Sequence, residues 1–125
     1  MSPTIWYSKK QSTVESSTFG SEIVALRITI EMIEGLQYKL RLFGVPIDGG
    51  ANIFCDNESV IKNTTYAQST LKKKHCAIAY HKIRESVAAG ICYIFFQTGH
   101  DNLADLLTKS LSAERRKYLM KGIFD

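Results

Sequence analysis

The sequence predicts a single α/β domain that spans residues 1–125 and contains a parallel sheet. Two short apolar runs, Ala51–Cys55 and Ile91–Phe96, are bounded by turn-forming residues, a pattern typical of buried strands. A helical pattern over Leu71–Ala89 lies between them, and a strand, a helical crossover and a second strand usually form a right-handed parallel unit. A chain of 125 residues is also long enough to bury one hydrophobic core.

The chain is expected to open with two short strands, Ile5–Tyr7 and Ser12–Glu15, joined by a polar turn. Potential N-caps at Ser16–Thr18 then begin a long helix over Phe19–Phe43, which Gly44 ends. Apolar side chains recur every three or four residues along this helix, as they do on one helical face. They are Leu26, Ile30, Ile33, Leu36, Leu40 and Phe43.

The middle of the chain contains a strand and two helices. After the Ala51–Cys55 strand, a short helix follows Asn57 and fades near Asn63–Thr65, and Tyr66–Thr70 is expected to be a loop. The helix over Leu71–Ala89 is capped by Gly90. Its inner stripe consists of Cys76, Ala79, Ile83 and Val87.

The last part of the chain begins with the most apolar run in the sequence. Ile91–Phe96 is apolar throughout, so we expect this strand to be buried on both faces. A loop over Thr98–Asn102 leads to a helix that opens near Leu103. A short amphipathic helix over Ala113–Phe124 follows, within a C-terminal segment of about residues 112–125.

Composition limits the class of protein. The chain is 45% hydrophobic and 22% charged, as globular domains are, and its net charge of +4 suits either a nucleic-acid partner or an ordinary basic domain. Its cysteines, Cys55, Cys76 and Cys92, are odd in number and show neither a disulfide framework nor zinc-ligand spacing. This favours a reducing, intracellular compartment. We find no apolar run of membrane-spanning length and no secretory leader.

Three carboxylates are predicted to meet at one edge of the sheet. Asp56 follows the first parallel strand, Asp105 lies in the first turn of the helix after the second, and Glu22 lies at the start of the first helix. Carboxylates held together repel unless cations bind between them, and oxygen ligands suit Mg²⁺ or Mn²⁺. Two such ions about 4 Å apart hydrolyse phosphodiesters in many nucleases. The alternatives are ordinary: Asp56 as a helix N-cap, and Glu22 as a favourable charge in a first helical turn.

Many short motifs, in order along nearly the whole chain, resemble the ribonuclease H region at the C-terminus of copia-type retrotransposon polyproteins. The segments that carry this resemblance are Trp6–Val14, Ser16–Thr18, Glu22–Leu26, Cys55–Asn57, Lys74–His75, Tyr80–His81, Arg84–Glu85, Leu103–Asp105 and Leu107–Lys109. Any one of them is weakly specific, whereas the ordered set is quite specific.

The resemblance implies a ribonuclease H-like three-layer fold with a mixed sheet, which cleaves the RNA strand of RNA–DNA hybrids during reverse transcription. Glu22, Asp56 and Asp105 match three of the family's four metal-binding catalytic acids, and two Mg²⁺ or Mn²⁺ ions are implied. The first acid belongs on a central strand upstream of Trp6, so we expect this piece alone to be inactive and marginally folded. The implied partner is the reverse transcriptase of the same polyprotein. The implied location is a cytoplasmic virus-like particle or the nucleus.

Basic residues on the second long helix are candidates for contact with the phosphates of a hybrid. They are Lys73, Lys74, His81 and Arg84. The alternative is a solvated helix face. His100, in the loop before Asp105, is a further candidate for a role in product release. The alternative is that His100 is a surface histidine without a function. The competing function is a degenerate nucleic-acid-binding or scaffold module, in which the acids serve only as caps.

Overall fold

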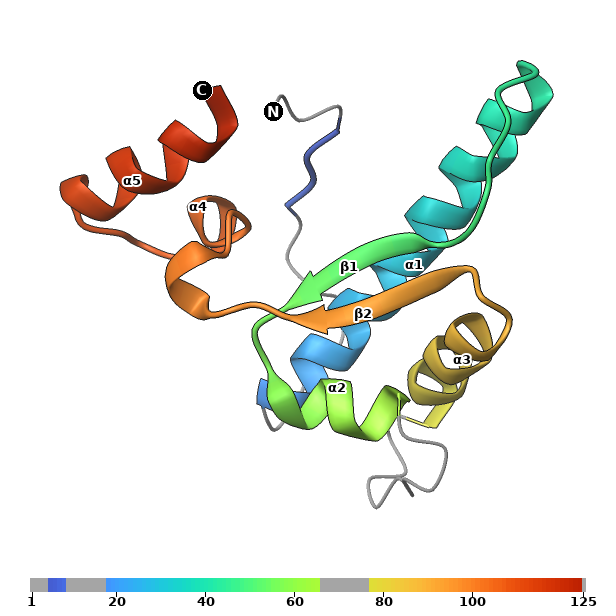
Figure 1. Cartoon of the computed structure of the whole chain (residues 1–125). Helices are drawn as coiled ribbons and strands as arrows, with labels where there is room; N and C mark the ends of the chain where they lie inside the picture. Colours follow the sequence, from blue (N-terminus) through green and yellow to red (C-terminus); the bar gives the residue numbers. More distant parts are fainter. Residues whose placement is uncertain (1–4, 9–17, 66–76, 125) are drawn as a thin grey trace. The chain divides into compact units, whose positions relative to one another are not determined.

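The computed structural model describes residues 5–8, 18–65 and 77–124 (Figure 1). The chain forms two compact units, which are treated separately below. One unit is Glu15–Phe96, and the other combines Met1–Val14 with Gln97–Asp125. Among the helices of the described residues, none is both long and apolar enough to cross a membrane.

The unit Glu15–Phe96 is a small α/β arrangement. Its elements are α1 (Thr18–Leu42), β1 (Ala51–Cys55), α2 (Glu58–Thr65), α3 (Ala77–Ala88) and β2 (Cys92–Phe96). β1 and β2 pair in parallel, in a register that runs from Ala51 opposite Cys92 to Cys55 opposite Phe96. The predicted α/β class and the parallel strand pair are therefore confirmed. The described residues contain this sheet of two strands, and the larger mixed sheet stays a prediction.

Both long helices end at the predicted glycines. Gly44 has a φ of +79° and Gly90 a φ of +74°, a conformation that glycine adopts without a Cβ clash. After α1, the Val45 amide donates to the Leu40 carbonyl at 3.0 Å, and the Gly44 amide donates to the Arg41 carbonyl at 3.0 Å. These two bonds satisfy carbonyls that the helix end leaves unpaired.

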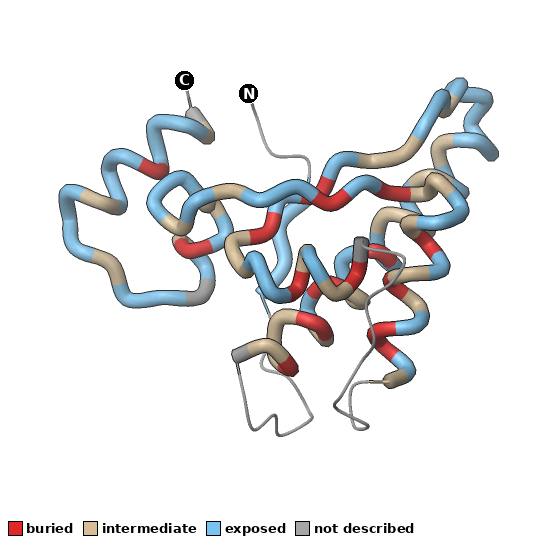
Figure 2. Tube along the Cα trace, turned by 60° about the horizontal axis from the view of Figure 1, so that its bottom comes forward, coloured by how far each residue is buried: buried red, intermediate tan, exposed pale blue. Residues whose placement is uncertain are grey.

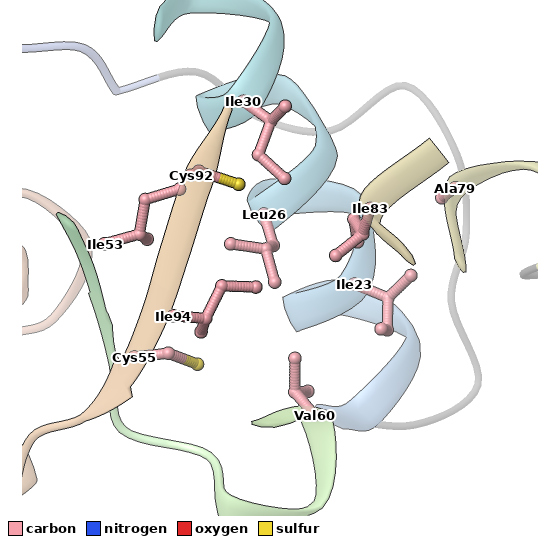
Figure 3. Close-up of a cluster of buried hydrophobic side chains, with 10 residues drawn as sticks. All are labelled: Ile23, Leu26, Ile30, Ile53, Cys55, Val60, Ala79, Ile83, Cys92 and Ile94. Atoms are coloured by element: carbon pink, nitrogen blue, oxygen red, sulfur yellow. The ribbon is translucent and has the colours of Figure 1, made fainter. Parts of the chain in front are cut away.

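The hydrophobic core lies between the sheet and the helices (Figure 3). α1 contributes Ile23, Leu26 and Ile30, and α3 contributes Ala79 and Ile83. The other members are Ile53, Cys55, Val60, Cys92 and Ile94. α2 contacts both α1 and α3, so all three helices of this unit share one core.

The predicted stripe of α1 is correct in its first half and wrong near its end. Ile23 and Ile30 are fully buried, whereas Leu36 is 39% exposed and Phe43, just beyond the helix, is 83% exposed. The helix has 25 residues, which at about 1.5 Å per residue is roughly twice the length of a five-residue strand at about 3.3 Å per residue. Its last turns therefore extend beyond the strands that could cover them (Figure 1).

The prediction that the second strand is buried on both faces is wrong. Cys92 and Ile94 are buried, but Tyr93 and Phe95, at the alternate positions, are 45% and 47% exposed; Phe96, the last residue of the strand, is also exposed (Figure 2). Alternate residues of a strand point to opposite faces, and the helices of this unit pack against the face that carries Cys92 and Ile94. On the other face the ring centroids of Phe54 and Phe95 lie 5.9 Å apart, with the two rings tilted by 34°.

The second unit contains the short 3-10 helix η2 (Gly99–Asp101), α4 (Asp105–Thr108) and α5 (Ala113–Phe124). α5 confirms the predicted C-terminal helix, and α4 begins two residues after the predicted start but keeps Asp105 in its first turn. The predicted strand Ile5–Tyr7 is wrong, because these residues are irregular and more than half exposed. Ser8 instead donates through Oγ to the Leu107 carbonyl at 3.1 Å, within this unit.

Several predictions fall outside the described residues. They are the strand Ser12–Glu15, the loop over Tyr66–Thr70 and the first part of the second long helix, Leu71–Cys76, which includes Lys73 and Lys74. From Ala77 onward that helix is present as α3, and Ala79, Ile83 and Val87 of its predicted stripe lie against the core.

Candidate metal centre

Glu22, Cys55 and Asp56 form a cluster of potential ligands within the unit Glu15–Phe96. Glu22 lies near the start of α1, Cys55 is the last residue of β1 and Asp56 follows it. One carboxylate oxygen of each acid and Sγ of Cys55 all lie within 4.8 Å of one another. The structure therefore brings together two of the three predicted acids, at the carboxyl end of the first strand.

The N-cap of α2 is Asn57 rather than Asp56. The Val60 amide donates to Oδ1 of Asn57 at 3.3 Å, which is the bond that an N-cap side chain makes to the third residue of a helix. Because Asn57 caps α2, the carboxylate of Asp56 lies outside the cap and faces the group of Glu22 and Cys55.

Cys55 is the member of the cluster that sequence reasoning missed. It is 7% exposed and, like Ile53, points from β1 into the core beneath the sheet (Figure 3). Burial raises the pKa of the Cys55 thiol, a hydrogen bond with the backbone of Asn57 lowers it, and the nearby carboxylates of Glu22 and Asp56 raise it further. The alternation of β1 could have predicted this position, because Cys55 is the last inward-facing residue of the strand and Asp56 follows it directly.

Asp105, the third predicted acid, lies in the other unit and is paired with cations there. The residue is 3% exposed. Lys109 Nζ lies 3.2 Å from its Oδ1, and Arg115 Nη2 lies 3.0 Å from its Oδ2. Arg115 also donates to the Gly99 carbonyl, which joins α5 to η2. The metal-binding role of Asp105 stays a prediction, and the structure adds a local role in which this carboxylate joins α4 to α5.

Replacing Arg115 by Ala is expected to destabilise this second unit by about 1–3 kcal/mol, because a buried carboxylate loses its charged partner. Lys109→Ala should cost less, since the Lys109 side chain is 56% exposed. Amide hydrogen exchange of α5 measures both effects, and Arg116→Ala on the exposed side of α5 is the matched control. Equal protection in the Arg115 and Arg116 variants would contradict the assignment.

His100 lies in η2, exposed, beside Asp101 and Tyr118. Its Nδ1 is 3.3 Å from Asp101 Oδ1, and its ring centroid is 4.7 Å from that of Tyr118. The Tyr118 hydroxyl donates to Asp101 Oδ1 at 2.7 Å. This bond first, and the bond from His100 second, lower the pKa of Asp101, with a smaller contribution from Thr98. The role of His100 in product release stays a prediction.

The lowered pKa of Asp101 predicts a dependence of stability on acid. A carboxyl whose pKa is lower in the folded state stabilises the fold above its unfolded value, and this contribution disappears as pH falls below about 4 and through the folded value. Tyr118→Phe removes the largest cause and should flatten the loss of α5 protection between neutral pH and acid. Hydrogen exchange at several pH values measures it, with Tyr38→Phe on α1 as the control.

The predicted phosphate-binding residues are described in part. His81 is exposed on α3, and its ring meets the Tyr80 ring edge-on at 5.2 Å. Arg84 Nη1 donates to the Tyr80 hydroxyl at 2.6 Å, and its guanidinium lies 5.4 Å from the ring centroid. Tyr80 is 2% exposed, so the hydroxyl and ring that Arg84 contacts belong to a buried side chain. The role of these residues in binding a hybrid stays a prediction.

The chemistry of the cluster suits a divalent cation. Two carboxylates that lie this close repel one another, and a cation between them relieves the repulsion. Their oxygens are ligands that Mg²⁺ and Mn²⁺ accept, and the carboxyl end of a strand is a usual place for such a site. Asp105 fits a metal only after exchange of its ion pairs, because both of its oxygens are paired in the second unit.

Comparison with known proteins finds relatives among the retrovirus-related Pol polyproteins of plant transposons. The chain is 32% identical over 110 residues to the retrovirus-related Pol polyprotein from transposon RE2 of Arabidopsis thaliana, and 33% identical over 110 residues to that from transposon RE1. It is 33% identical over 107 residues to the corresponding polyprotein from transposon TNT 1-94 of Nicotiana tabacum.

The matched region covers most of this chain but little of each relative. It spans 88% of the chain for the two Arabidopsis polyproteins and 83% for the tobacco polyprotein, and in each case 8% of the relative. No family model matches the chain, and no solved structure matches it.

Proposed function

We propose that this chain, similar to one segment of retrotransposon Pol polyproteins, is the ribonuclease H region of a copia-type polyprotein. Its function is then to cleave the RNA strand of RNA–DNA hybrids by metal-dependent phosphodiester hydrolysis. The observation that carries the proposal is the meeting of Glu22 and Asp56 at the end of β1. The Pol relatives support a domain derived from a polyprotein.

Glu22 and Asp56 are the residues that would hold Mg²⁺ or Mn²⁺. When bound, the cations supply an activated water and stabilise the charge that develops on the leaving oxygen. The two side chains orient the site from α1 and from the end of β1, both anchored in the same core. As a metal ligand, Asp105 would give up its pairs with Lys109 and Arg115.

The substrate side of the proposal rests on charge. The chain has a net charge of +4, and α3 presents His81 together with Arg84, which Tyr80 holds in place. An arginine whose guanidinium is oriented by a buried neighbour suits the phosphates of a hybrid, because its N–H donors are already oriented for oxygen acceptors. With Lys73 and Lys74, these residues would bind hybrids by charge and shape, and binding would weaken as salt rises.

The test is made in a full polyprotein, because the described residues bring together two of the predicted acids rather than the complete set. The matching segment of the transposon RE2 polyprotein is replaced by this chain, and the product is incubated with an RNA–DNA hybrid in Mg²⁺. We expect cleavage of the labelled RNA strand and intact DNA. If the unmodified RE2 polyprotein cleaves the hybrid and the exchanged protein does not, the proposal is rejected. The isolated chain is expected to be inactive.

A second function is a nucleic-acid-binding or scaffold module without catalysis. The pairing of both Asp105 oxygens favours it, since a carboxylate used in this way holds α4 and α5 together and needs no metal. Mg²⁺ titration separates the two functions. A metal centre should raise the melting temperature as Mg²⁺ increases, and Glu22→Gln should remove the increase, whereas a scaffold should not respond.

The proposed setting follows from the polyprotein. The partner in the same chain would be the reverse transcriptase part, and the substrate would be the hybrid that it synthesises. The proposed location is intracellular, in a cytoplasmic virus-like particle or in the nucleus.

A further inference from the structure

The candidate metal centre contains a thiol as well as two carboxylates. Sγ of Cys55 and oxygens of Glu22 and Asp56 lie within 4.8 Å of one another. Ligand atoms lie about 2.0–2.3 Å from a bound zinc ion, so side-chain shifts of about an ångström would bring all three onto one cation. The three residues come from α1 and the end of β1, within one unit, and both elements are anchored in its core.

Comparison with Cys92 shows what is particular to Cys55. Both thiols are buried on neighbouring strands and point into the same core (Figure 3). The register places Cys92 opposite Ala51, whereas Cys55 lies at the other end of the sheet, opposite Phe96. In the described ranges of the chain, the cluster of three potential ligands forms around Cys55 and excludes Cys92.

A thiol changes which cation such a site prefers. Mg²⁺ is a hard ion that takes oxygen ligands and keeps several waters, whereas thiolate selects softer ions such as Zn²⁺ and its heavier analogue Cd²⁺. Three protein ligands with a further position open to water are the usual set of an accessible zinc site. On binding, the sulfur–metal bond replaces the S–H bond and the proton leaves to solvent.

We propose that Glu22, Cys55 and Asp56 bind one thiophilic divalent cation, Zn²⁺ or Cd²⁺, and that this cation competes with Mg²⁺ for the two carboxylates. The evidence for the cation site is the position of its three donor atoms, Sγ of Cys55 and one carboxylate oxygen each from Glu22 and Asp56. Its consequence for hybrid cleavage, inhibition by zinc at a fixed Mg²⁺ concentration, rests on the proposed function. Cys55 is then the residue that determines the metal preference of the centre.

The test uses the full chain, reduced, with Cd²⁺ alone and no nucleic acid. Cadmium–thiolate bonds absorb in the near ultraviolet by charge transfer, so binding is read directly at the sulfur. We expect a band that saturates at one equivalent of Cd²⁺ and that Zn²⁺ displaces. Cys55→Ser should abolish the band, and Cys92→Ser, which removes the second buried thiol among the described residues, should leave it. Glu22→Gln keeps the thiol and should weaken Cd²⁺ binding roughly tenfold or more.

The outcomes are separable. A band that survives Cys55→Ser, or Cd²⁺ affinity unchanged by Glu22→Gln, would overturn the proposal. Far-ultraviolet circular dichroism of each variant verifies the fold. If Cys55→Ser fails to fold, Glu22→Gln is the variant that tests the cation site, because Glu22 lies outside the core cluster. Absence of Mg²⁺-dependent cleavage by the exchanged polyprotein, beside an unmodified relative that cleaves, would reject the proposed function and leave the Cd²⁺ band of this chain unaffected. Cleavage without a Cd²⁺ band would reject the cation site alone.

Discussion

Replacing Asp56 by Asn is expected to lower hybrid cleavage by the exchanged polyprotein by at least about a hundredfold, the usual effect of losing one preorganised electrostatic group at a reaction centre. The neutral amide removes one of the two charges that meet at the end of β1, so the affinity for Mg²⁺ falls. The fold should be unaffected, because Asn57 and not Asp56 caps α2. Initial rates of RNA cleavage in saturating and limiting Mg²⁺ measure the effect.

The matched control for this substitution is Asp48→Asn, the same chemical change in the exposed loop before β1. It should leave the cleavage rate and its Mg²⁺ dependence unchanged. Full cleavage by the Asp56 variant would mean that this carboxylate does not take part in the reaction. Equal losses in both variants would point to an effect of overall charge.

Replacing Ile83 by Ala is expected to lower the free energy of unfolding of the unit Glu15–Phe96 by about 2–5 kcal/mol, the range seen when a large buried aliphatic side chain is truncated. Ile83 is fully buried where α3 meets the rest of the core (Figure 3). Its truncation leaves a cavity and removes contacts that join α3 to α1. Urea unfolding followed by far-ultraviolet circular dichroism measures the change.

Ile78→Ala is the control on the same helix, because Ile78 is 86% exposed. A surface change of this kind should alter the unfolding free energy by no more than about 0.5 kcal/mol. Similar effects of the two substitutions would mean that α3 does not pack as described. Because Glu22 lies on α1, loss of this core should also disturb the candidate metal centre.

Much of the secondary structure could be predicted from the sequence, because helices, strands and caps depend on short-range patterns. The helix predicted over Phe19–Phe43 is α1 (Thr18–Leu42), and Gly44 ends it through a left-handed backbone conformation that the residue type favours. The Ala51–Cys55 strand and the short helix after Asn57 were likewise predictable, because each depends on neighbours within a few residues.

Predictions failed where they depended on what packs against a segment. Ile91–Phe96 is apolar throughout, and an apolar run does not reveal whether one face or two is covered. The helices of the unit Glu15–Phe96 cover one face, so Tyr93 and Phe95 are exposed on the other. Ile5–Tyr7 has the residue types of a strand, but a strand needs hydrogen-bonded neighbours, and Ser8 beside it bonds to Leu107 instead.

By itself the sequence determined the identity of the acids and the elements that carry them. Spacing places Glu22 at the start of a helix and Asp56 at the end of a strand, since both positions follow from short-range periodicity. It also determined the resemblance to ribonuclease H regions of retrotransposon polyproteins, which rests on ordered motifs.

Tertiary structure alone decided which groups these acids meet. Packing of α1 beneath β1 brings Glu22 to Cys55 and Asp56, and in the second unit Arg115 of α5 meets Asp105 of α4. Partners that lie on different elements leave no periodic trace in a sequence, because their distance depends on how whole elements pack. The charge and softness of a metal site are properties of such packing.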